Sequence, residues 1–220
     1  PVGTAPGARY RHTAVYDPAS DRMIVFGGLN DAGTSVNELW ALSLSDPPTW
    51  EQLAPTGTPP GGRHSHVAIY DPPHGRMVMQ GGRNGSLGFD DLWELSLGDA
   101  PAWTQLAPAG TGPGAMSGHQ AVYDPLRHRM VAYHYPTELW ELSLGDPPTW
   151  TLLLPGGIWP TPRLGASAVY DPLNDRMTIF GGADGSSYAD LNDAYVVQWD
   201  FFGSAGVPQE WVAVSGLRPP

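Results

Sequence analysis

Histidine side chains recur at fixed places in this 220-residue sequence. His12, His66 and His119 each stand five residues before the Asp of an Asp-Pro pair, and Ala166 takes the equivalent place in a fourth stretch. Three equivalent imidazoles have the donor atoms that zinc and nickel prefer. We nevertheless expect these side chains to serve packing and hydrogen bonding, because equivalent residues of repeated units lie farther apart than one metal ion spans. We therefore predict no metal site.

Arginines recur in the same register. Arg9, Arg63 and Arg163 stand three residues before the histidine positions, and Met116 is the exception. A set of guanidinium groups can hold a carboxylate or a sugar acid through paired hydrogen bonds. The structural alternative, which we favour, is that each arginine forms an ion pair that holds adjacent units together.

Acidic and amide residues gather in three loop-like stretches, at 30–31, 90–91 and 184–193. Clustered carboxylates attract calcium, but none of these stretches has the alternating spacing of an EF-hand loop. We expect them to cap turns and strand ends.

Residues 84–86, Asn-Gly-Ser, match the N-glycosylation pattern. Asn-Gly is also a favoured hairpin turn, and we prefer that interpretation.

The sequence gives no sign of a catalytic centre or a resident cofactor. It contains no serine-centred elbow, phosphate loop or metalloprotease motif. The absence of Cys excludes disulfides, thiolate metal ligands and a cysteine nucleophile. We therefore predict no catalytic residues and no cofactor, and we expect a protein that is not an enzyme.

The charge pattern argues against two classes of partner. The formal net charge is −11, and all 11 basic residues are Arg. A field of this sign repels the nucleic-acid backbone and anionic lipid surfaces. No apolar run approaches the roughly 18 residues of a transmembrane helix. We expect neither nucleic-acid binding nor membrane insertion.

The elements that would position these residues come from an internal repeat. Tyr-Asp-Pro occurs at 16–18, 70–72, 123–125 and 170–172, with successive offsets of 54, 53 and 47 residues. Arg-Met, a short apolar run and a pair of aromatic residues follow in the same order, and a diglycine closes the apolar run in three of the four units. The repeated glycines and tryptophans are Gly27, Gly28, Trp40, Trp50, Gly81, Gly82, Trp93, Trp103, Trp140, Trp150, Gly181, Gly182 and Trp211.

Each unit therefore has four strand-length segments separated by turn residues, which predicts a four-stranded antiparallel meander. No segment shows convincing 3.6-residue periodicity, so we expect almost no helix. We expect the repeated tryptophans to lie in the core between neighbouring sheets.

This order of motifs resembles the kelch repeat over essentially the whole chain. The resemblance implies an all-β fold, a β-propeller built from four-stranded antiparallel kelch blades. We expect one array over residues 1–220 with four blades at approximately 9–55, 63–108, 116–155 and 163–215. Kelch rings usually have five to seven blades, so we also expect further blades, or a second copy of the chain, to complete a larger ring. The linker-like residues 217–220 favour the same interpretation.

The kelch arrangement places the loops after the second and fourth strands on one face, and these are the variable loops of this chain. The third unit departs from the others, with Tyr-His-Tyr-Pro at 133–136 in place of its diglycine region. We predict the binding site on this loop face. Its candidate residues are His64, Arg83, Asn84, Phe89, Trp159, Arg163 and Tyr188.

Our first functional hypothesis is a non-enzymatic binding or scaffold module that recognises a protein or a glycan through this face. One alternative is a sugar-processing enzyme resembling kelch-type sialic acid mutarotases, with the arginine set holding a carboxylate. The other is a structural subunit of a larger assembly. The bias to Ala, Gly, Pro and Arg, with no Lys, resembles a GC-rich bacterial genome. The sequence carries no direct evidence for the location of the protein, and our working expectation is an extracellular or cell-surface location on a bacterium.

Overall fold

The computed structural model describes residues 1–199 and 208–214. In these residues the fold is all-β, apart from one 3-10 turn, η1 (Pro72–His74), and no helix is long and apolar enough to cross a membrane. Residues 215 and 217–220, which end the fourth predicted blade and resemble a linker, lie outside the described residues.

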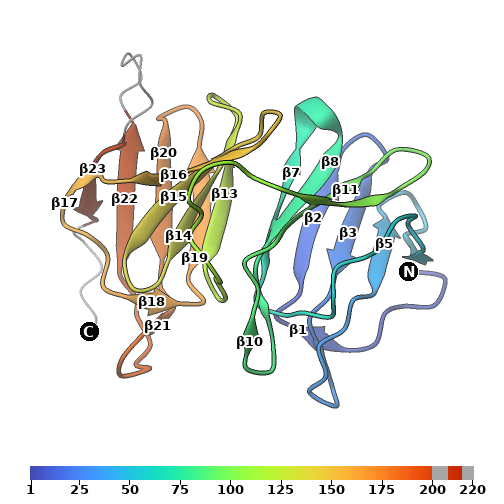
Figure 1. Cartoon of the computed structure of the whole chain (residues 1–220). Coiled ribbons are helices and arrows are strands. Elements are labelled where there is room, and N and C mark those ends of the chain that lie inside the picture. The colour runs from blue at the N-terminus through green and yellow to red at the C-terminus, as the bar shows by residue number, and fades with distance from the viewer. Residues whose placement is uncertain (200–207, 215–220) are drawn as a thin grey trace. The chain divides into compact units, whose positions relative to one another are not determined.

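Four antiparallel sheets follow one another along the chain (Figure 1). The first contains β2 (Thr13–Asp17), β3 (Arg22–Phe26), β5 (Leu39–Ser43) and β6 (Thr49–Leu53). The second contains β7 (Val67–Asp71), β8 (Arg76–Gln80), β11 (Leu92–Ser96) and β12 (Trp103–Leu106). The third contains β13 (Gln120–Asp124), β14 (Arg129–His134), β15 (Glu138–Ser143) and β16 (Thr149–Leu153). The fourth contains β19 (Ser167–Asp171), β20 (Arg176–Phe180), β22 (Ala194–Trp199) and β23 (Pro208–Ala213), with β17 (Gly156–Gly157) parallel to β23. The predicted meanders are confirmed.

Three short ribbons involve the loops after the second strands, and in two of them the partner strand lies before the first strand of the sheet. They pair β1 (Arg9–Tyr10) with β4 (Leu29–Asn30), β9 (Arg83–Asn84) with β10 (Leu87–Gly88), and β18 (Arg163–Leu164) with β21 (Ala183–Asp184). The third repeat has no such ribbon, because β14 and β15 continue to a tight turn after His134. Residues 133–134 of the shortened loop thus extend β14, and residues 135–137 form the turn to β15.

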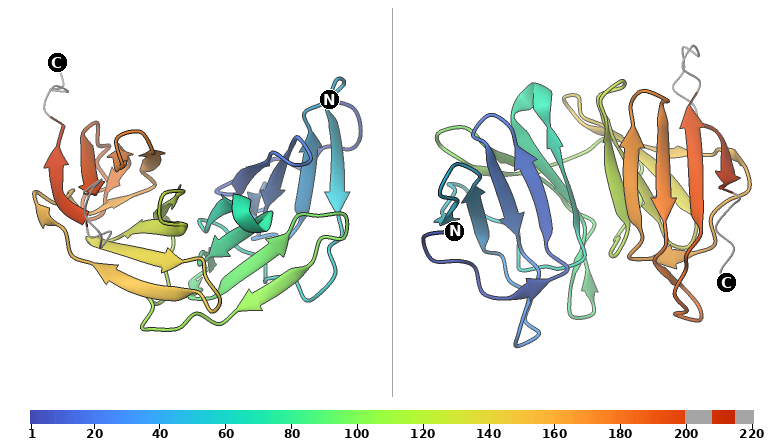
Figure 2. Two further views of the ribbon diagram at one scale, coloured as in Figure 1. Left: turned by 90° about the horizontal axis from the view of Figure 1, so that it is seen from above. Right: turned by 180° about the vertical axis from the view of Figure 1, so that it is seen from behind.

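The chain divides into two compact units. Unit 1 comprises residues 1–107 and 114–117 and holds the first two sheets, and unit 2 comprises 108–113 and 118–220 and holds the other two. Within each unit the first strands of the two sheets, β2 with β7 and β13 with β19, lie against each other (Figure 2). Apolar side chains between those sheets form the core of each unit.

Glycine is required where a repeat's loops approach each other closely. Gly82 has φ +91°, and a Cβ there would lie 2.8 Å from the His66 Cβ and 2.9 Å from the His64 carbonyl oxygen. A side chain at this position would clash with the backbone in a conformation that L residues rarely adopt. The diglycine signature therefore marks the crossing of the loops before the first and after the second strand.

The repeated tryptophans pack in the core, with one exception. Trp93 and Trp103 are 8% and 5% exposed, and their rings meet edge to face with centroids 6.5 Å apart. Trp140 and Trp150 repeat this arrangement at 6.4 Å. Trp50 is only half-buried. Trp40 and Trp211 are buried.

Candidate functional site

The recurring arginines each form an ion pair inside their own repeat. The Arg63 guanidinium donates to both carboxylate oxygens of Asp91, at 2.5 and 2.8 Å, and to the Gly81 carbonyl at 2.9 Å. Trp93 donates its indole N–H to the same carboxylate at 2.7 Å. Burial acts to raise the pKa of Asp91, but the hydrogen bonds from Arg63 and Trp93 outweigh it and hold that pKa below its ordinary value.

The first and fourth repeats use the same arrangement. Arg9 pairs with Glu38 at 2.6 Å, and Arg163 pairs with Asp193 at 2.7 Å. The ion-pair interpretation is therefore confirmed. The expectation that these pairs join adjacent units is wrong, because each arginine precedes the first strand of a sheet and its acidic partner precedes the third strand of the same sheet. These guanidinium groups are committed to the fold. The sugar-processing alternative required these arginines to hold the carboxylate of a sugar acid, and they are already paired with Glu38, Asp91 and Asp193.

Two arginines on unit 1 lack such partners. Of the ten arginines in the described part of the chain, eight form ion pairs with Asp or Glu: Arg9, Arg22, Arg63, Arg76, Arg127, Arg129, Arg163 and Arg176. Arg11 and Arg83 form none there, and both are exposed. In a protein with net charge −11, two guanidinium groups without a carboxylate partner stand out.

His64 lies between these two arginines. Its backbone pairs with that of Arg83 through two hydrogen bonds of 3.0 Å, and the next residue, Ser65, donates its N–H to the Arg11 carbonyl at 2.9 Å. The His64 side chain is 5% exposed and is hydrogen-bonded to Ser35 through Nδ1 at 2.9 Å. Burial, followed by the positive charges of Arg11 and Arg83, lowers the pKa of His64. We name Arg11, His64 and Arg83 the Arg–His–Arg surface.

Backbone strain marks Arg11 within this surface. Arg11 has φ +58°, a left-handed conformation that disfavours residues with a Cβ. The equivalent residues of the other repeats are Ser65, Gly118 and Gly165, at φ +56°, +70° and +65°. Two repeats thus use the residue that fits this conformation best, whereas the first repeat holds a charged side chain there. Such strain is often retained at functional positions.

The other predicted binding residues of unit 1 take different places. Asn84 is exposed and begins the turn of the β9–β10 ribbon, where Gly85 has φ +58°, so the turn interpretation of Asn-Gly is confirmed. Phe89 is half-buried, and the Arg63 guanidinium lies over its ring at 4.1 Å. The structure brings His64 and Arg83 together, while Phe89 supports a structural ion pair.

The predicted binding residues of unit 2 divide in the same way. Trp159 donates its indole N–H to the Pro155 carbonyl at 3.1 Å and packs on Trp211, with ring centroids 6.0 Å apart. Arg163 is 1% exposed in its ion pair. Tyr188 is 73% exposed with φ +57° and is the one of these three that faces solvent.

Several other polar groups singled out by the sequence have structural partners. His66 is hydrogen-bonded to Thr13 at 2.8 Å, and burial, with smaller contributions from Arg63 and the nearby histidines, lowers the pKa of His66 to about 3. The His119 ring lies edge-on to His134 at 6.2 Å. Asn30 and Asp184 accept backbone N–H groups in their own loops, at 2.9 and 2.7 Å, so the turn-capping expectation is confirmed for these two residues.

Sequence reasoning missed Arg11. The sequence does carry a signal, because an alignment of the four repeats puts Arg, Ser, Gly and Gly directly before the histidine column. A column that contains two glycines indicates a left-handed backbone. An arginine in such a column is unexpected on conformational grounds.

Comparison with known proteins assigns the family. A family model described as the KLHDC2/KLHL20/DRC7 Kelch-repeats domain matches residues 1–135, more than half of the chain. The chain is 38% identical over 116 residues to Host cell factor homolog hcf-1 of Caenorhabditis elegans, covering 47% of this chain and 15% of that protein. It is 31% identical over 100 residues to Acyl-CoA-binding domain-containing protein 5 of Arabidopsis thaliana, covering 46% and 15%.

A third relative is Dynein regulatory complex subunit 7 of Chlamydomonas reinhardtii, 38% identical over 80 residues, which cover 36% of this chain and 7% of that protein. The chain thus spans at most 15% of the length of these relatives. The family match agrees with the repeated four-stranded sheets, the diglycine crossings and the arginine–acid–tryptophan contacts. The chain belongs to the kelch-repeat family, and its sheets are kelch blades of a β-propeller.

Proposed function

We propose that this chain is a non-enzymatic protein-binding module whose Arg–His–Arg surface receives carboxylates from an acidic segment of a partner protein. The observation that carries this proposal is the contrast between eight ion-paired arginines and Arg11 and Arg83, which form no ion pair within the described residues although Arg83 Nε donates to the Gly85 carbonyl at 2.8 Å. Arginine presents a planar fork that matches a carboxylate with two parallel hydrogen bonds. A carboxylate of the partner protein would supply the negative charge that Arg11 and Arg83 do not find within the described part of this chain.

His64 fits this role because its pKa is lowered in the free protein. A neutral imidazole beside two guanidinium groups adds no repulsion, and a bound carboxylate would favour its protonation. Binding and proton uptake at His64 would then be linked. The chain's overall negative charge would slow the approach of acidic partners, so affinity would come from local contacts rather than from long-range attraction.

Family membership supports a protein partner over a glycan. The name of the relative Dynein regulatory complex subunit 7 describes it as a subunit of a complex. Exposed loops on a rigid β scaffold are also a common way to present a recognition surface.

The experiment is a selection of binding peptides. A random peptide library is panned against the whole 220-residue chain, and the selected sequences are compared with the unselected pool. We expect enrichment of Asp and Glu, and loss of binding in Arg11→Gly and Arg83→Gln but not in Arg176→Ser, whose arginine lies at the Asp-Pro end of unit 2. Selected peptides without acidic enrichment, or equal binding by all variants, would overturn the proposal.

A second candidate, self-association, rests on an uncovered sheet face. In unit 1, Val15 and Phe26 are 7% and 0% exposed, in a core that also includes Ala68 and Tyr70 of the second sheet. The equivalents in the fourth sheet, Val169 and Phe180, are 62% and 49% exposed. An apolar sheet face of this kind marks an interaction site.

The first sheet offers the complementary face. Ala14 and Tyr16, the equivalents of Ala68 and Tyr70, are exposed. We propose that the first sheet of a second copy packs on Val169 and Phe180 as the second sheet packs on Val15 and Phe26. Head-to-tail contacts of this type form rings or open chains.

A further inference from the structure

We propose that a cleft in unit 1 binds the arginine side chain of a partner polypeptide. The cleft lies between the first and second sheets at their Asp-Pro end and has a volume of about 690 Å³. Ligand pockets commonly have roughly 300–1,000 Å³. The Arg–His–Arg surface adjoins the start of β2, whereas this cleft adjoins its end, so the two proposals are independent. The residues that carry the argument are Asp17, Ser20, Glu51, Tyr70, Gly75 and Asp99.

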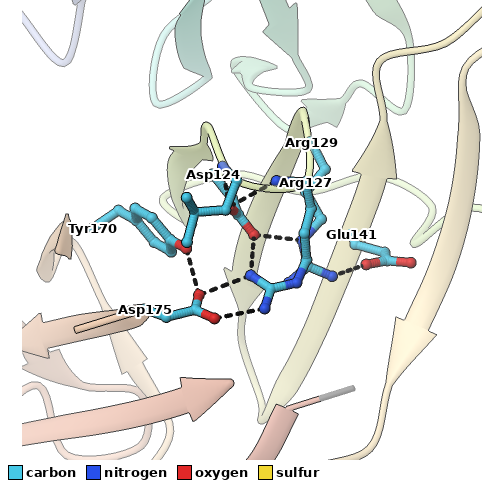
Figure 3. Close-up of polar contacts among 7 residues, drawn as sticks. Asp124, Arg127, Arg129, Glu141, Tyr170 and Asp175 are labelled. Atoms are coloured by element: carbon cyan, nitrogen blue, oxygen red, sulfur yellow. Dashed lines mark hydrogen bonds and ion pairs between the residues drawn. The ribbon is translucent and has the colours of Figure 1, made fainter. Parts of the chain in front are cut away.

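The equivalent place in unit 2 holds an arginine of the chain itself. Arg127 stands three residues after Asp124, and its guanidinium donates to both oxygens of Asp175, at 2.7 and 2.5 Å, and to Asp124 at 3.2 Å (Figure 3). Tyr170 donates its hydroxyl to Asp175 at 2.6 Å. Asp124 and Asp175 are 0% and 1% exposed. This kelch scaffold therefore accommodates a guanidinium between two neighbouring sheets.

Unit 1 lacks both members of that pair. Ser20 stands three residues after Asp17, in the place of Arg127, and Gly75 stands in the place of Asp175. Gly75 and Asp175 have φ +55° and +49°, so the turn itself is the same. Because both charges are absent from unit 1, no buried ion is left unpaired there. It also leaves the space between the sheets unfilled.

The buried acid at the base of the cleft keeps capacity for another donor. Asp17 is 1% exposed, and its Oδ2 accepts one hydrogen bond, from Arg22 Nε at 2.9 Å. The equivalent oxygen of Asp124 accepts bonds from both Arg129 and Arg127. A ligand guanidinium in the place of the Arg127 side chain would supply the second bond.

The rest of the lining matches a long cationic side chain. Three carboxylates, those of Asp17, Glu51 and Asp99, line the cleft. The basic side chains of the lining already have acidic partners: Arg22 pairs with Asp17, and His74 contacts Asp71 at 3.0 Å. Within the described residues Glu51 and Asp99 form no ion pair, and the Tyr70 hydroxyl forms no hydrogen bond. The apolar side chains of Leu53, Leu97 and Pro101 also line it and suit the alkyl stem of arginine.

The test uses Nα-acetyl-arginine amide as the probe and Nα-acetyl-citrulline amide, its uncharged analogue, as the matched control. Both are titrated into the isotope-labelled whole chain while backbone amide shifts are recorded by NMR. We expect saturable shifts at Ser20, Gly75 and Gly98 with the arginine compound and at least 10-fold weaker binding of citrulline. Equal shifts with both compounds, or arginine-induced shifts elsewhere only, would overturn the proposal.

Two sets of variants locate the site. Ser20→Arg with Gly75→Asp rebuilds the unit 2 arrangement, so we expect it to fill the cleft and abolish the shifts. Glu51→Gln with Asp99→Asn changes only exposed side chains, and we expect roughly 5-fold weaker binding. Arg11→Gly should leave arginine binding unchanged while weakening acidic-peptide binding, which separates this proposal from the proposed function. Full arginine binding by both double variants would contradict the assignment.

Discussion

The Arg11 carbonyl accepts a hydrogen bond of 2.9 Å from the Ser65 N–H, and both residues are in the left-handed conformation. In unit 2, Gly118 and Gly165 form the same bond at 3.1 Å. The contact therefore depends on the backbone and needs no side chain at either position. Arg11 has a conformation that favours glycine. A substitution by glycine can therefore remove the Arg11 side chain while the backbone hydrogen bond is kept.

The structural arginines should behave differently from Arg11. In Arg63→Ala the Asp91 carboxylate loses its ion-pair partner and keeps only the Trp93 indole N–H as a side-chain donor, and the Gly81 carbonyl loses the Arg63 hydrogen bond. We expect the free energy of unfolding to fall by about 3–5 kcal/mol, the usual cost of breaking a buried ion pair. Urea denaturation followed by tryptophan fluorescence measures this. A loss below about 1 kcal/mol would show that the ion pair is dispensable.

The ion pair between Arg127 and Asp175 leads to a second prediction about stability. Arg127→Ser leaves a buried carboxylate with Tyr170 as its main donor, and we expect a loss of about 3 kcal/mol. Arg127→Ser combined with Asp175→Gly reproduces the pairing of Ser20 with Gly75 and should recover at least half of that loss. A double-mutant cycle measures the coupling. Additive losses would contradict a direct interaction.

His66 predicts a pH dependence of stability. The pKa of His66 is lowered to about 3 in the folded protein, mainly because the side chain is buried, whereas an unfolded histidine titrates near 6.5. The unfolded chain therefore binds one more proton between these values, and stability falls as the pH drops below about 6.5, by up to about 1.4 kcal/mol per pH unit.

His66→Gln can keep a hydrogen bond to Thr13 and has no titratable group. We expect its stability to vary less with pH between about 6.5 and 4, by the equivalent of one proton, as followed by urea unfolding at several pH values. Identical slopes for the two proteins would show that His66 titrates normally.

The sequence identified the sheets because their signals are local. Asp-Pro turns, diglycines and alternating apolar residues act over a few positions, and each appears where expected. The partners of Arg63 and Arg163 stand 28 and 30 residues downstream, so the fold alone determines that each pair stays within one repeat. Phe89 and Trp159 stay predicted binding residues, and their contacts with Arg63 and Trp211 were beyond sequence reasoning, since aromatic burial depends on tertiary neighbours. The blade boundaries, the single array, the bacterial origin and the location stay predictions.

Self-association should depend on the uncovered face of the fourth sheet. We expect sedimentation velocity of the 220-residue chain to show a concentration-dependent increase in mass, because Val169 and Phe180 become buried on association. Val169→Glu introduces a charge at an exposed position and should yield a monomer with unchanged stability. A wild-type chain that remains monomeric at high concentration would contradict this proposal.

The proposed linkage at His64 predicts that acidic peptides bind more tightly at lower pH. A bound carboxylate raises the pKa of His64 above its lowered value in the free protein, so protonation favours the complex. Calorimetry between pH 7.5 and 5.5 should show increasing affinity for a selected peptide. In His64→Gln this pH dependence should disappear, and an unchanged dependence would assign it to another group.

The most direct test of the Arg–His–Arg surface measures two properties of Arg11→Gly. Glycine fits φ +58° without strain, so we expect the free energy of unfolding to stay equal or to rise by up to about 1 kcal/mol. The affinity for the tightest library-selected acidic peptide, measured by calorimetry, should fall about 10-fold or more, while Arg176→Ser binds as the wild type does. Wild-type affinity in a stable Arg11→Gly protein would contradict the account.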